Sequence, residues 1–223
     1  MRLSSIALVM VLMLASPLLR AQPLPPDNER GQFCASEVLR QRMVDESPFA
    51  RSRGRALDMA ISDVLDRRNR QGSISGGSGD ETIYTIPVVF HIIHNNGPEN
   101  LSDAAIFQAI RNLNDAFRNV GVYDSTTGVD TRIMFCLAQQ DESGHYSTGI
   151  NRVESPLTVD TVELRDQAVK SLSHWNPDTY LNIWVVKEIY SLGVGPSVSG
   201  YAAPLGSQGS PRDGVVVESF LFS

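Results

Sequence analysis

The chain has 223 residues, a formal net charge of −6, and 42% hydrophobic and 7% aromatic residues. This length allows one or two domains with a hydrophobic core. The negative net charge argues against a nucleic-acid partner, because binding nucleic acid normally needs a basic patch. It also argues against binding to an anionic membrane surface. We therefore expect no nucleic acid as a partner and, once the leader is removed, no membrane.

Residues 1–21 predict an export signal. Arg2 supplies the positive start, an apolar run extends from Ile6 to Leu14, Pro17 ends it, and Ala21 is the predicted last residue before cleavage. The apolar stretch is shorter than the roughly 20 residues that a membrane span needs, so a cleaved signal is favoured over an anchor. The expected localisation is therefore secreted.

Residues 22–71 form a separate segment, in which 34–70 have a helical pattern. Ser47-Pro48 is a typical helix start, and Leu57, Ile61 and Leu65 repeat at helical spacing on an arginine-rich background. Residues 72–81 are rich in glycine and serine, which is typical of a flexible linker. The linker marks the boundary with the remaining part, residues 82–223.

Beyond the linker the patterns of strands and helices alternate. Strands are predicted at 83–93, 131–138, 180–186, 200–203 and 213–218, and helices at about 103–117 and 162–172. The run 180–186 is apolar almost throughout, as expected for a strand buried on both faces. The order predicts an α/β fold with a layered sheet and right-handed crossovers.

Several blocks of this part resemble one known family in sequence and in order. They are Ile86–Ile93, the helical pattern Leu101–Phe117, Trp175–Val186, Gly200–Pro204 and Asp213–Val217. The run Trp-x-Pro-x-x-Tyr-Leu-Asn-Ile-Trp is the most specific of them. Together they resemble the pappalysin family of metzincin zinc endopeptidases. The resemblance implies that 82–223 is the N-terminal subdomain of a metallopeptidase catalytic domain, with a twisted, mostly parallel five-stranded sheet, backing helices and a helical pro-segment before it.

The resemblance also implies where a substrate binds. Gly200, Tyr201, Ala202 and Ala203 match an edge strand above the substrate cleft, to which an extended peptide or protein substrate adds as one more strand. The complete enzyme would use zinc as its cofactor, with calcium left open as a second ion. Zinc would lower the pKa of a bound water, and the resulting hydroxide would attack the peptide carbonyl.

Residues 22–71 resemble the pro-segment of a zymogen. Such segments hold latency by placing a cysteine thiolate on the catalytic zinc, and Cys34 is the candidate. The alternatives are a free cysteine or half of a disulfide with Cys136. Activation would be a cut before Tyr84, at Arg67-Arg68 or at Arg70.

The metzincin zinc motif, His-Glu-x-x-His-x-x-Gly-x-x-His, is absent from the 223 residues. The histidines are His91, His94, His145 and His174, and none starts such a run. We therefore assign no catalytic residue and interpret the chain as a fragment of a secreted zinc-dependent metalloendopeptidase, inactive by itself. The alternative is a non-catalytic secreted peptide-binding or degenerate protease-like module.

Three further expectations concern packing. His91 and His94 lie three apart in a predicted strand and point to opposite faces, so they are interpreted as structural histidines. Cys136 lies in the apolar run Ile133–Leu137 and is expected to be buried. The sheet of an isolated N-terminal subdomain is expected to leave apolar strand surface exposed to water.

Overall fold

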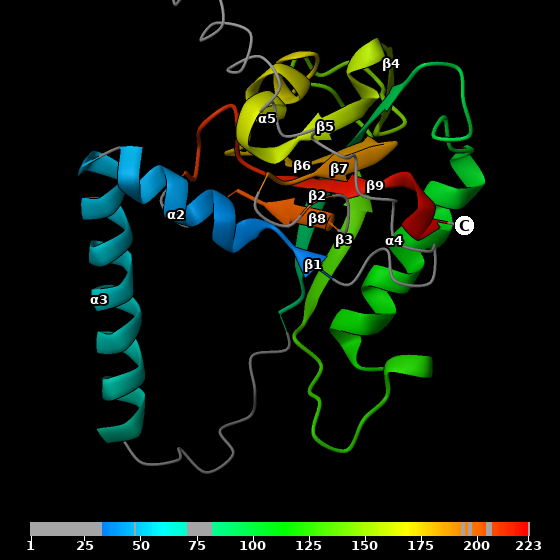
Figure 1. Cartoon of the computed structure of the whole chain (residues 1–223). Coiled ribbons are helices and arrows are strands. Elements are labelled where there is room, and N and C mark those ends of the chain that lie inside the picture. Colours follow the sequence, from blue (N-terminus) through cyan, green and yellow to red (C-terminus); the bar gives the residue numbers. More distant parts are fainter. Residues whose placement is uncertain are drawn as a thin grey trace, which may run out of the picture.

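The computed structural model describes residues 33–46, 48–70, 82–192, 195, 198–203 and 207–222 (Figure 1). The predicted export signal and the linker 72–81 lie outside these residues. The helices are α2 (Ser36–Glu46), α3 (Pro48–Arg70), α4 (Asp103–Arg118) and α5 (Val162–Ser171), with short 3₁₀ turns η2 (Gly121–Tyr123), η3 (Pro156–Thr158) and η4 (Ser219–Phe222). The strands are β1 (Phe33–Cys34), β2 (Tyr84–His94), β3 (Ile133–Leu137), β4 (Ile150–Glu154), β5 (Val159–Thr161), β6 (Leu181–Val186), β7 (Glu188–Tyr190), β8 (Val198–Ala202) and β9 (Val215–Glu218).

Seven strands form one sheet in the order β1-β8-β9-β6-β2-β3, and β4 also pairs with β2. Every pair is parallel except β8 with β9. Strand β3 lies beside the first half of β2 and β4 beside the second half, so both occupy one position in the sheet. The part after the linker is therefore five positions wide, and the predicted mostly parallel α/β sheet is confirmed.

Besides strand β4, two shorter additions to the predicted sheet were not predicted. Strand β1, from the segment before the linker, adds a sixth position next to β8. Strands β5 and β7 form a separate two-stranded parallel sheet beside the main one. Each of these elements has only two or three residues, which is too short for the alternation of apolar and polar residues to indicate a strand.

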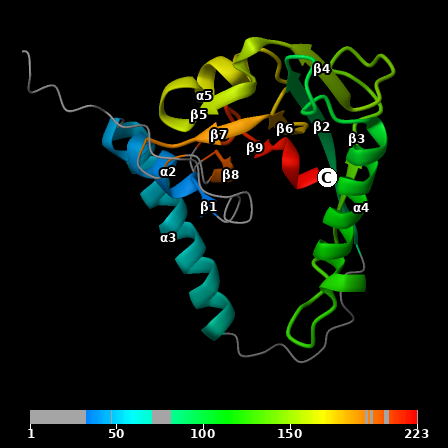
Figure 2. The same cartoon turned by 45° about the vertical axis from the view of Figure 1, so that its right-hand side comes forward.

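The sheet is buried on both faces because its central strands place apolar side chains on alternate sides. On β6, Ile183 and Val185 join one cluster with Ile106 of α4, whereas Trp184 and Val186 join the other with residues of α5. Figures 1 and 2 show α4 and α5 on different sides of the sheet. The expectation that apolar strand surface stays exposed is therefore wrong for these strands.

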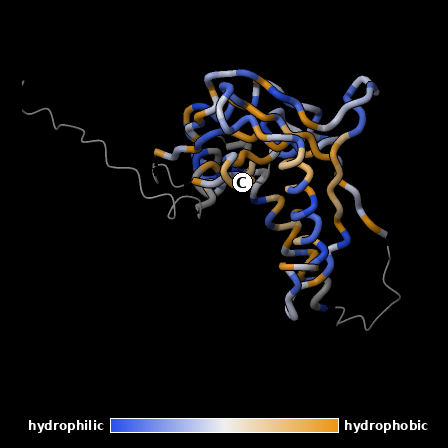
Figure 3. Tube along the Cα trace, turned by 90° about the vertical axis from the view of Figure 1, so that its right-hand side faces the viewer, coloured by the Kyte–Doolittle hydropathy of each residue, from blue (hydrophilic) through white to orange (hydrophobic). Residues whose placement is uncertain are grey.

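Helix α4 begins and ends as its sequence predicts. The Ser102 side chain accepts a hydrogen bond from the Ala105 N–H at 3.3 Å, and Asn119 ends the helix in the left-handed conformation with φ of 55°. Apolar and polar residues alternate along the helix in Figure 3, which gives it one face for the sheet. This amphipathic pattern made α4 easy to predict.

Pro87 lies within β2 at a position where its missing N–H removes no hydrogen bond between strands. The even-numbered residues of β2 direct their N–H groups toward β3 and β4, as Tyr84 does to the Arg132 carbonyl. The nitrogen of Pro87 therefore faces the side of β6, whose pairing begins only with Val88 and Leu181. Proline is tolerated there because no partner strand needs its donor.

Helix α3 begins at Pro48, as predicted, and packs against α2. It stands apart from the sheet in Figure 1, and its apolar side chains Met59, Ile61, Val64 and Leu65 are exposed. Its last residue is Arg70. Within the described ranges, no helix has the length and apolar character needed to cross a membrane.

Candidate functional site

The four residues predicted to bind substrate lie at one edge of the sheet. Gly200, Tyr201 and Ala202 belong to β8, and Ala203 follows and donates its N–H to the Gly214 carbonyl at 2.8 Å. On one side β8 pairs with β9, in the register Gly200 with Val217. A Cβ at position 200 would lie only 2.8 Å from the Val216 carbonyl oxygen, so glycine permits this close pairing.

The other side of β8 is occupied by the chain itself. Strand β1 pairs with it in parallel, with Phe33 opposite Val198 and Cys34 opposite Gly200. The Ala35 N–H then donates to the Gly200 carbonyl at 3.1 Å. The predicted peptide-binding edge thus holds an extended segment, which comes from the region before the linker.

The added strand ends where helix α2 begins. The Ala202 N–H donates a hydrogen bond of 2.8 Å to the side-chain oxygen of Ser36, the first residue of α2. A continuing strand would offer a main-chain carbonyl at this point, and the hydroxyl takes that role instead. Ala35 and Leu39 are buried against the same face as Tyr201, so both packing and hydrogen bonds hold this segment.

Tyr201 offers only its main chain to a neighbouring strand, because its side chain points into the core. The side chain is 1% exposed. Its hydroxyl lies 2.5 Å from Oδ2 of Asp160 and 3.0 Å from Oδ1 of Asp166. Burial, followed by the nearby carboxylates, raises the pKa of the Tyr201 hydroxyl well above its ordinary value. Tyr201 is therefore an anchor of the edge strand.

Charged side chains meet this anchor inside the protein. Lys170 is 1% exposed, and its Nζ lies 2.7 Å from Oδ1 of Asp166, which also pairs with Arg212. Burial lowers the pKa of Lys170. Burial raises the pKa of Asp160 to about 6, and the buried Oδ1 atom of this carboxyl has no hydrogen-bond partner among the described residues. These groups were missed from the sequence, although Asp166 and Lys170 have the i,i+4 spacing of a helical ion pair.

The metal-binding candidate Cys34 lies in β1, at the position opposite Gly200. Its side chain is outside the described part of the structure. Among the described residues, no group of three or more His, Cys, Asp or Glu side chains could hold a metal ion. The described residues therefore do not fit a complete zinc site, and no reaction step is assigned to a metal here.

His91 has a structural environment, as predicted. Its Nε2 lies 2.8 Å from the Asn182 side-chain oxygen, and its Nδ1 lies 2.9 Å from the Ser173 hydroxyl. The ring also stacks on Trp184 with 5.4 Å between ring centroids. Burial lowers the pKa of His91 to about 4, against the opposing effect of the Asn182 hydrogen bond. The imidazole is thus neutral at neutral pH.

The tautomer of His91 follows from its neighbours. Asn182 accepts the Trp175 N–H at 2.8 Å and donates to the Trp175 carbonyl at 2.9 Å, which fixes its amide orientation. Because the Asn182 oxygen can only accept, Nε2 of His91 carries the proton and Nδ1 accepts from Ser173. His91 therefore ties strand β2 to the loop that begins the Trp-x-Pro-x-x-Tyr-Leu-Asn block.

His94 and His145 lie apart from this arrangement, whereas His174 directly follows Ser173 and is one of the causes that lower the pKa of His91. Nδ1 of His94 accepts the Asn96 N–H at 3.3 Å. The His145 side chain is 80% exposed and lies 3.4 Å from Asp141, in the polar turn predicted from the sequence. The His145 main-chain N–H is the main cause that lowers the pKa of Asp141. His174 lines an open polar cavity with Trp175.

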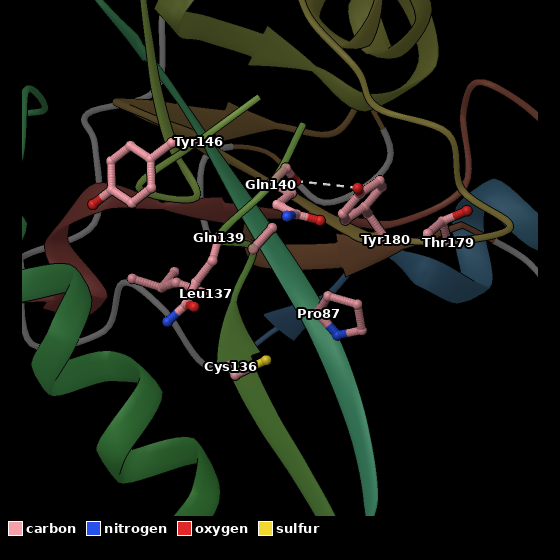
Figure 4. Close-up of a pocket in the computed structure, with 9 residues that line it drawn as sticks. Pro87, Cys136, Leu137, Gln139, Gln140, Tyr146, Thr179 and Tyr180 are labelled. Carbon is pink, nitrogen blue, oxygen red and sulfur yellow. Dashed lines mark hydrogen bonds between the residues drawn. The ribbon is translucent and has the colours of Figure 1, made fainter. Parts of the chain in front are cut away.

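Cys136 is exposed and free, so the expectation of a buried side chain is wrong. Its strand lies at the edge of the sheet, where the apolar run alternates between a covered side and an open one. Cys136 lines an open cavity of about 560 Å³ with Pro87, Tyr146 and Tyr180. Figure 4 shows these side chains, with the Tyr180 hydroxyl donating to the Gln140 carbonyl at 3.1 Å. This cavity borders β3, at the opposite edge from β8.

Comparisons with known proteins place this architecture among metallopeptidases. No model of a protein family matches the chain, and no curated protein matches it. Solved structures do match. Mature mirolysin of Tannerella forsythia in complex with a cleaved peptide is 31% identical, with a TM-score of 0.53, over 62% of this chain and 53% of that chain. Mirolysin in complex with compound 9 has the same identity and coverage, with a TM-score of 0.52.

A promirolysin mutant from Tannerella forsythia matches over a longer stretch. It is 27% identical, with a TM-score of 0.56, over 85% of this chain and 59% of that chain. This coverage is more than residues 82–223 alone can supply, so it includes part of the segment before the linker. The chain spans little more than half the length of these structures. The likeness supports a metzincin-type metallopeptidase fold.

Proposed function

We propose that this chain is the amino-terminal part of a secreted zinc-dependent metalloendopeptidase of the pappalysin type, in its zymogen form. The observation that carries the proposal is the pairing of β1 with β8, which puts a segment from before the linker on the predicted substrate edge. The longer match to promirolysin than to mature mirolysin supports a pro-segment there. Secretion is supported by the export pattern of residues 1–21.

The leading segment and a substrate would compete for the same main-chain groups. An extended peptide added to β8 needs the Gly200 carbonyl as an acceptor and the Ala202 N–H as a donor. Ala35 and Ser36 occupy these two groups. A peptide therefore gains access to this edge only after β1 leaves it, which is the latency that we propose.

Cys34 remains the candidate for a direct link to zinc. Its place in β1 opposite Gly200 puts it on the strand that lies along the proposed cleft. When bound, zinc would polarise the scissile carbonyl and activate water. The contribution that we propose for this chain is different: β8 binds and orients the peptide main chain, and β1 blocks it.

Activation is proposed to cut the chain after the leading helices. Arg67 and Arg68 lie inside helix α3, whose last residue is Arg70. A protease needs an extended backbone, so a cut between Arg67 and Arg68 would require the end of α3 to unwind. The structure thus favours Arg70 among the proposed sites.

The coding DNA beyond the codon for Ser223 tests the proposed enzyme directly. We expect it to encode His-Glu-x-x-His-x-x-Gly-x-x-His in the same reading frame. A stop codon directly after Ser223 would contradict the protease and favour the alternative, a secreted module that captures peptides on β8. Amino-terminal sequencing of the exported protein, expected to begin at Gln22, tests secretion.

Latency is tested by removing one donor of the added strand. Ala35→Pro deletes the N–H that bonds the Gly200 carbonyl, whereas Ala35→Gly keeps it. We expect trypsin to cleave within α2 and α3 about tenfold faster in Ala35→Pro than in Ala35→Gly, as for loss of roughly one hydrogen bond. Equal cleavage rates in the two variants would show that β1 does not hold the segment in place.

A further inference from the structure

Behind the edge strand lies a cluster of charged and polar side chains around the Tyr201 hydroxyl, all buried except the half-exposed Arg212. Five side chains from four parts of the chain meet there: Asp160 of β5, Asp166 and Lys170 of α5, Tyr201 of β8, and Arg212 before β9. The Lys170 ammonium also lies 5.3 Å from the ring centroid of Trp184 and 5.2 Å from that of Tyr201. The cluster joins the helix layer to the strand that is proposed to bind peptides.

The number of protons in the cluster decides how many hydrogen bonds it can make. The Tyr201 hydroxyl lies within hydrogen-bond distance of two carboxyl groups, at 2.5 Å and 3.0 Å. A hydroxyl has one hydrogen, so it can donate to only one of two ionised carboxylates. A second proton on Asp160 would allow both contacts to be hydrogen bonds, because Asp160 would then donate to Tyr201 and Tyr201 to Asp166.

We propose that Asp160 and Asp166 are positioning residues for the peptide-binding edge: through the Tyr201 hydroxyl they fix β8, and the protonation of Asp160 sets how firmly β8 is held. This inference rests on the proposed function only in taking β8 as the edge that accepts a strand. It requires neither a metal nor turnover.

The geometry explains how the cluster acts on the main chain. Tyr201 lies between the two residues whose main-chain groups bond the added strand, Gly200 and Ala202. A shift of the Tyr201 side chain would therefore move both groups. On the far side, Asp166 is held by Lys170, and Lys170 also donates to the Arg212 carbonyl at 2.9 Å. The edge strand is thus braced against helix α5.

The charge environment indicates which carboxyl titrates. Both cations, Lys170 and Arg212, contact Asp166. Asp160 faces the Tyr201 hydroxyl and the Asp166 carboxyl, with Lys170 further away, and burial raises its pKa to about 6. Below this pH the cluster makes both hydrogen bonds to Tyr201. Above it, one proton serves two carboxylates, and we expect β8 to be held less firmly.

Amide hydrogen exchange of the full chain tests this inference, with protection factors corrected for the intrinsic effect of pH. In the wild type we expect the amides of Tyr201, Ala202 and Ala203 to be better protected at pH 5 than at pH 7.5. Tyr201→Phe should reduce their protection about tenfold at pH 5, as for one lost hydrogen bond, and leave β2 and β6 unchanged. Asp160→Asn, which is neutral at both pH values, should remove the pH dependence.

Tyr180→Phe is the matched control, because it deletes a tyrosine hydroxyl bonded to the Gln140 carbonyl at the opposite edge. It should leave the protection of β8 as in the wild type. Should Tyr201→Phe fail to fold, Asp160→Asn alone tests the inference. This variant is expected to fold because asparagine and aspartate side chains have nearly the same shape. The inference is overturned if β8 protection in Tyr201→Phe equals that of the wild type, or if the pH dependence persists in Asp160→Asn. Neither result would bear on whether the complete protein hydrolyses peptides.

Discussion

The main-chain N–H of Ala202 donates a 2.8 Å hydrogen bond to the hydroxyl oxygen of Ser36, a residue 166 positions earlier in the chain. Ser36 begins helix α2 directly after strand β1. A side chain thus takes the place of a strand carbonyl at the point where the added strand ends. The leading segment is thereby fixed to the sheet at both its strand and its helix start.

This contact predicts that Ser36→Ala loosens the leading segment. The substitution leaves the Ala202 N–H without this acceptor, which should cost about 1 kcal/mol of docking free energy. Ser36→Thr keeps the hydroxyl and is the matched control. Hydrogen exchange at the Ala202 amide measures the effect: protection should fall in the alanine variant and persist in the threonine variant. Equal protection in both would remove the proposed role of the hydroxyl.

Asp160→Asn is predicted to change how stability depends on pH. The pKa of Asp160 in the folded state, about 6, is raised above its ordinary value by burial. Its contribution to stability is therefore fully present below about pH 4 and lost as the pH rises through about 6. The asparagine variant should be more stable than the wild type at pH 7.5, by about 1–3 kcal/mol. Urea denaturation between pH 4 and 8 measures this, and a variant that is less stable at pH 7.5 contradicts it.

His91→Phe is predicted to lower stability at neutral pH and to weaken the loss of stability in acid. The lowered pKa of His91, about 4, means that its contribution is present above pH 6.5 and lost as the pH falls toward 4. Phenylalanine keeps the stacking on Trp184 but leaves the Ser173 hydroxyl without its acceptor. We expect the phenylalanine variant to be about 2 kcal/mol less stable than the wild type at pH 7. On acidification the variant should then lose less stability than the wild type, because it has no imidazole to protonate. Denaturation midpoints at pH 7 and pH 5 provide the test, and an unchanged acid slope would argue against a buried neutral imidazole.

Asn114 is predicted to protect the open edge of β3. Its side-chain amide accepts the Phe135 N–H at 2.7 Å and donates to the Phe135 carbonyl at 2.9 Å, as a neighbouring strand would. Asn114→Ala should lower stability by about 1–2 kcal/mol and promote self-association through the exposed edge. Asn112→Ala, at an exposed position of the same helix, is the control. Urea denaturation and sedimentation velocity would show the difference, whereas equal behaviour of the two variants would exclude the protective role.

The expressed 223-residue chain is predicted to show no zinc-dependent proteolysis. It lacks the His-Glu-x-x-His motif, and the described residues offer no set of ligands for a metal. A peptide library incubated with the chain and added zinc should remain uncut, with and without prior trypsin treatment. Turnover that a chelator abolishes would contradict this prediction, because it would require a metal site within the 223 residues.

The strands and helices that pack through a long periodic face were predictable. The capped amphipathic helix α4 and the apolar strands β2 and β6 were placed to within a few residues. The helix shows its period in the sequence, and each strand is a long β-branched, apolar run. The short strands β4, β5 and β7 were missed. Strand β4 contains an asparagine, an arginine and a glutamate within five residues, and it is a strand only because β2 lies beside it.

The candidate site was predictable only in part. The edge strand at 200–203 followed from the resemblance to a family, but nothing in the local sequence of Phe33–Ser36 indicates that it pairs with this strand. Contacts between residues so far apart depend on the whole fold. Likewise, Tyr201 reads as a surface residue of an edge strand, and only the packing of α5 behind β8 makes it an anchor between two carboxyl groups.

The error at Cys136 has a simple physical origin. An apolar run of five residues predicts a strand, but it does not say whether one or both sides of that strand are covered. Strand β3 lies at the edge of the sheet and is covered mainly by α4. The side chain of Cys136 therefore reaches solvent although the residues around it are apolar.

The exchange rate of the Ala35 amide in the full chain tests whether the strand at Phe33–Cys34 lies on the proposed peptide-binding edge. This N–H donates to the Gly200 carbonyl across the two strands. We predict a slow rate that rises in parallel with that of Ala202 when denaturant is added. An Ala35 amide that exchanges as fast as an unstructured peptide, while β2 stays protected, would contradict it.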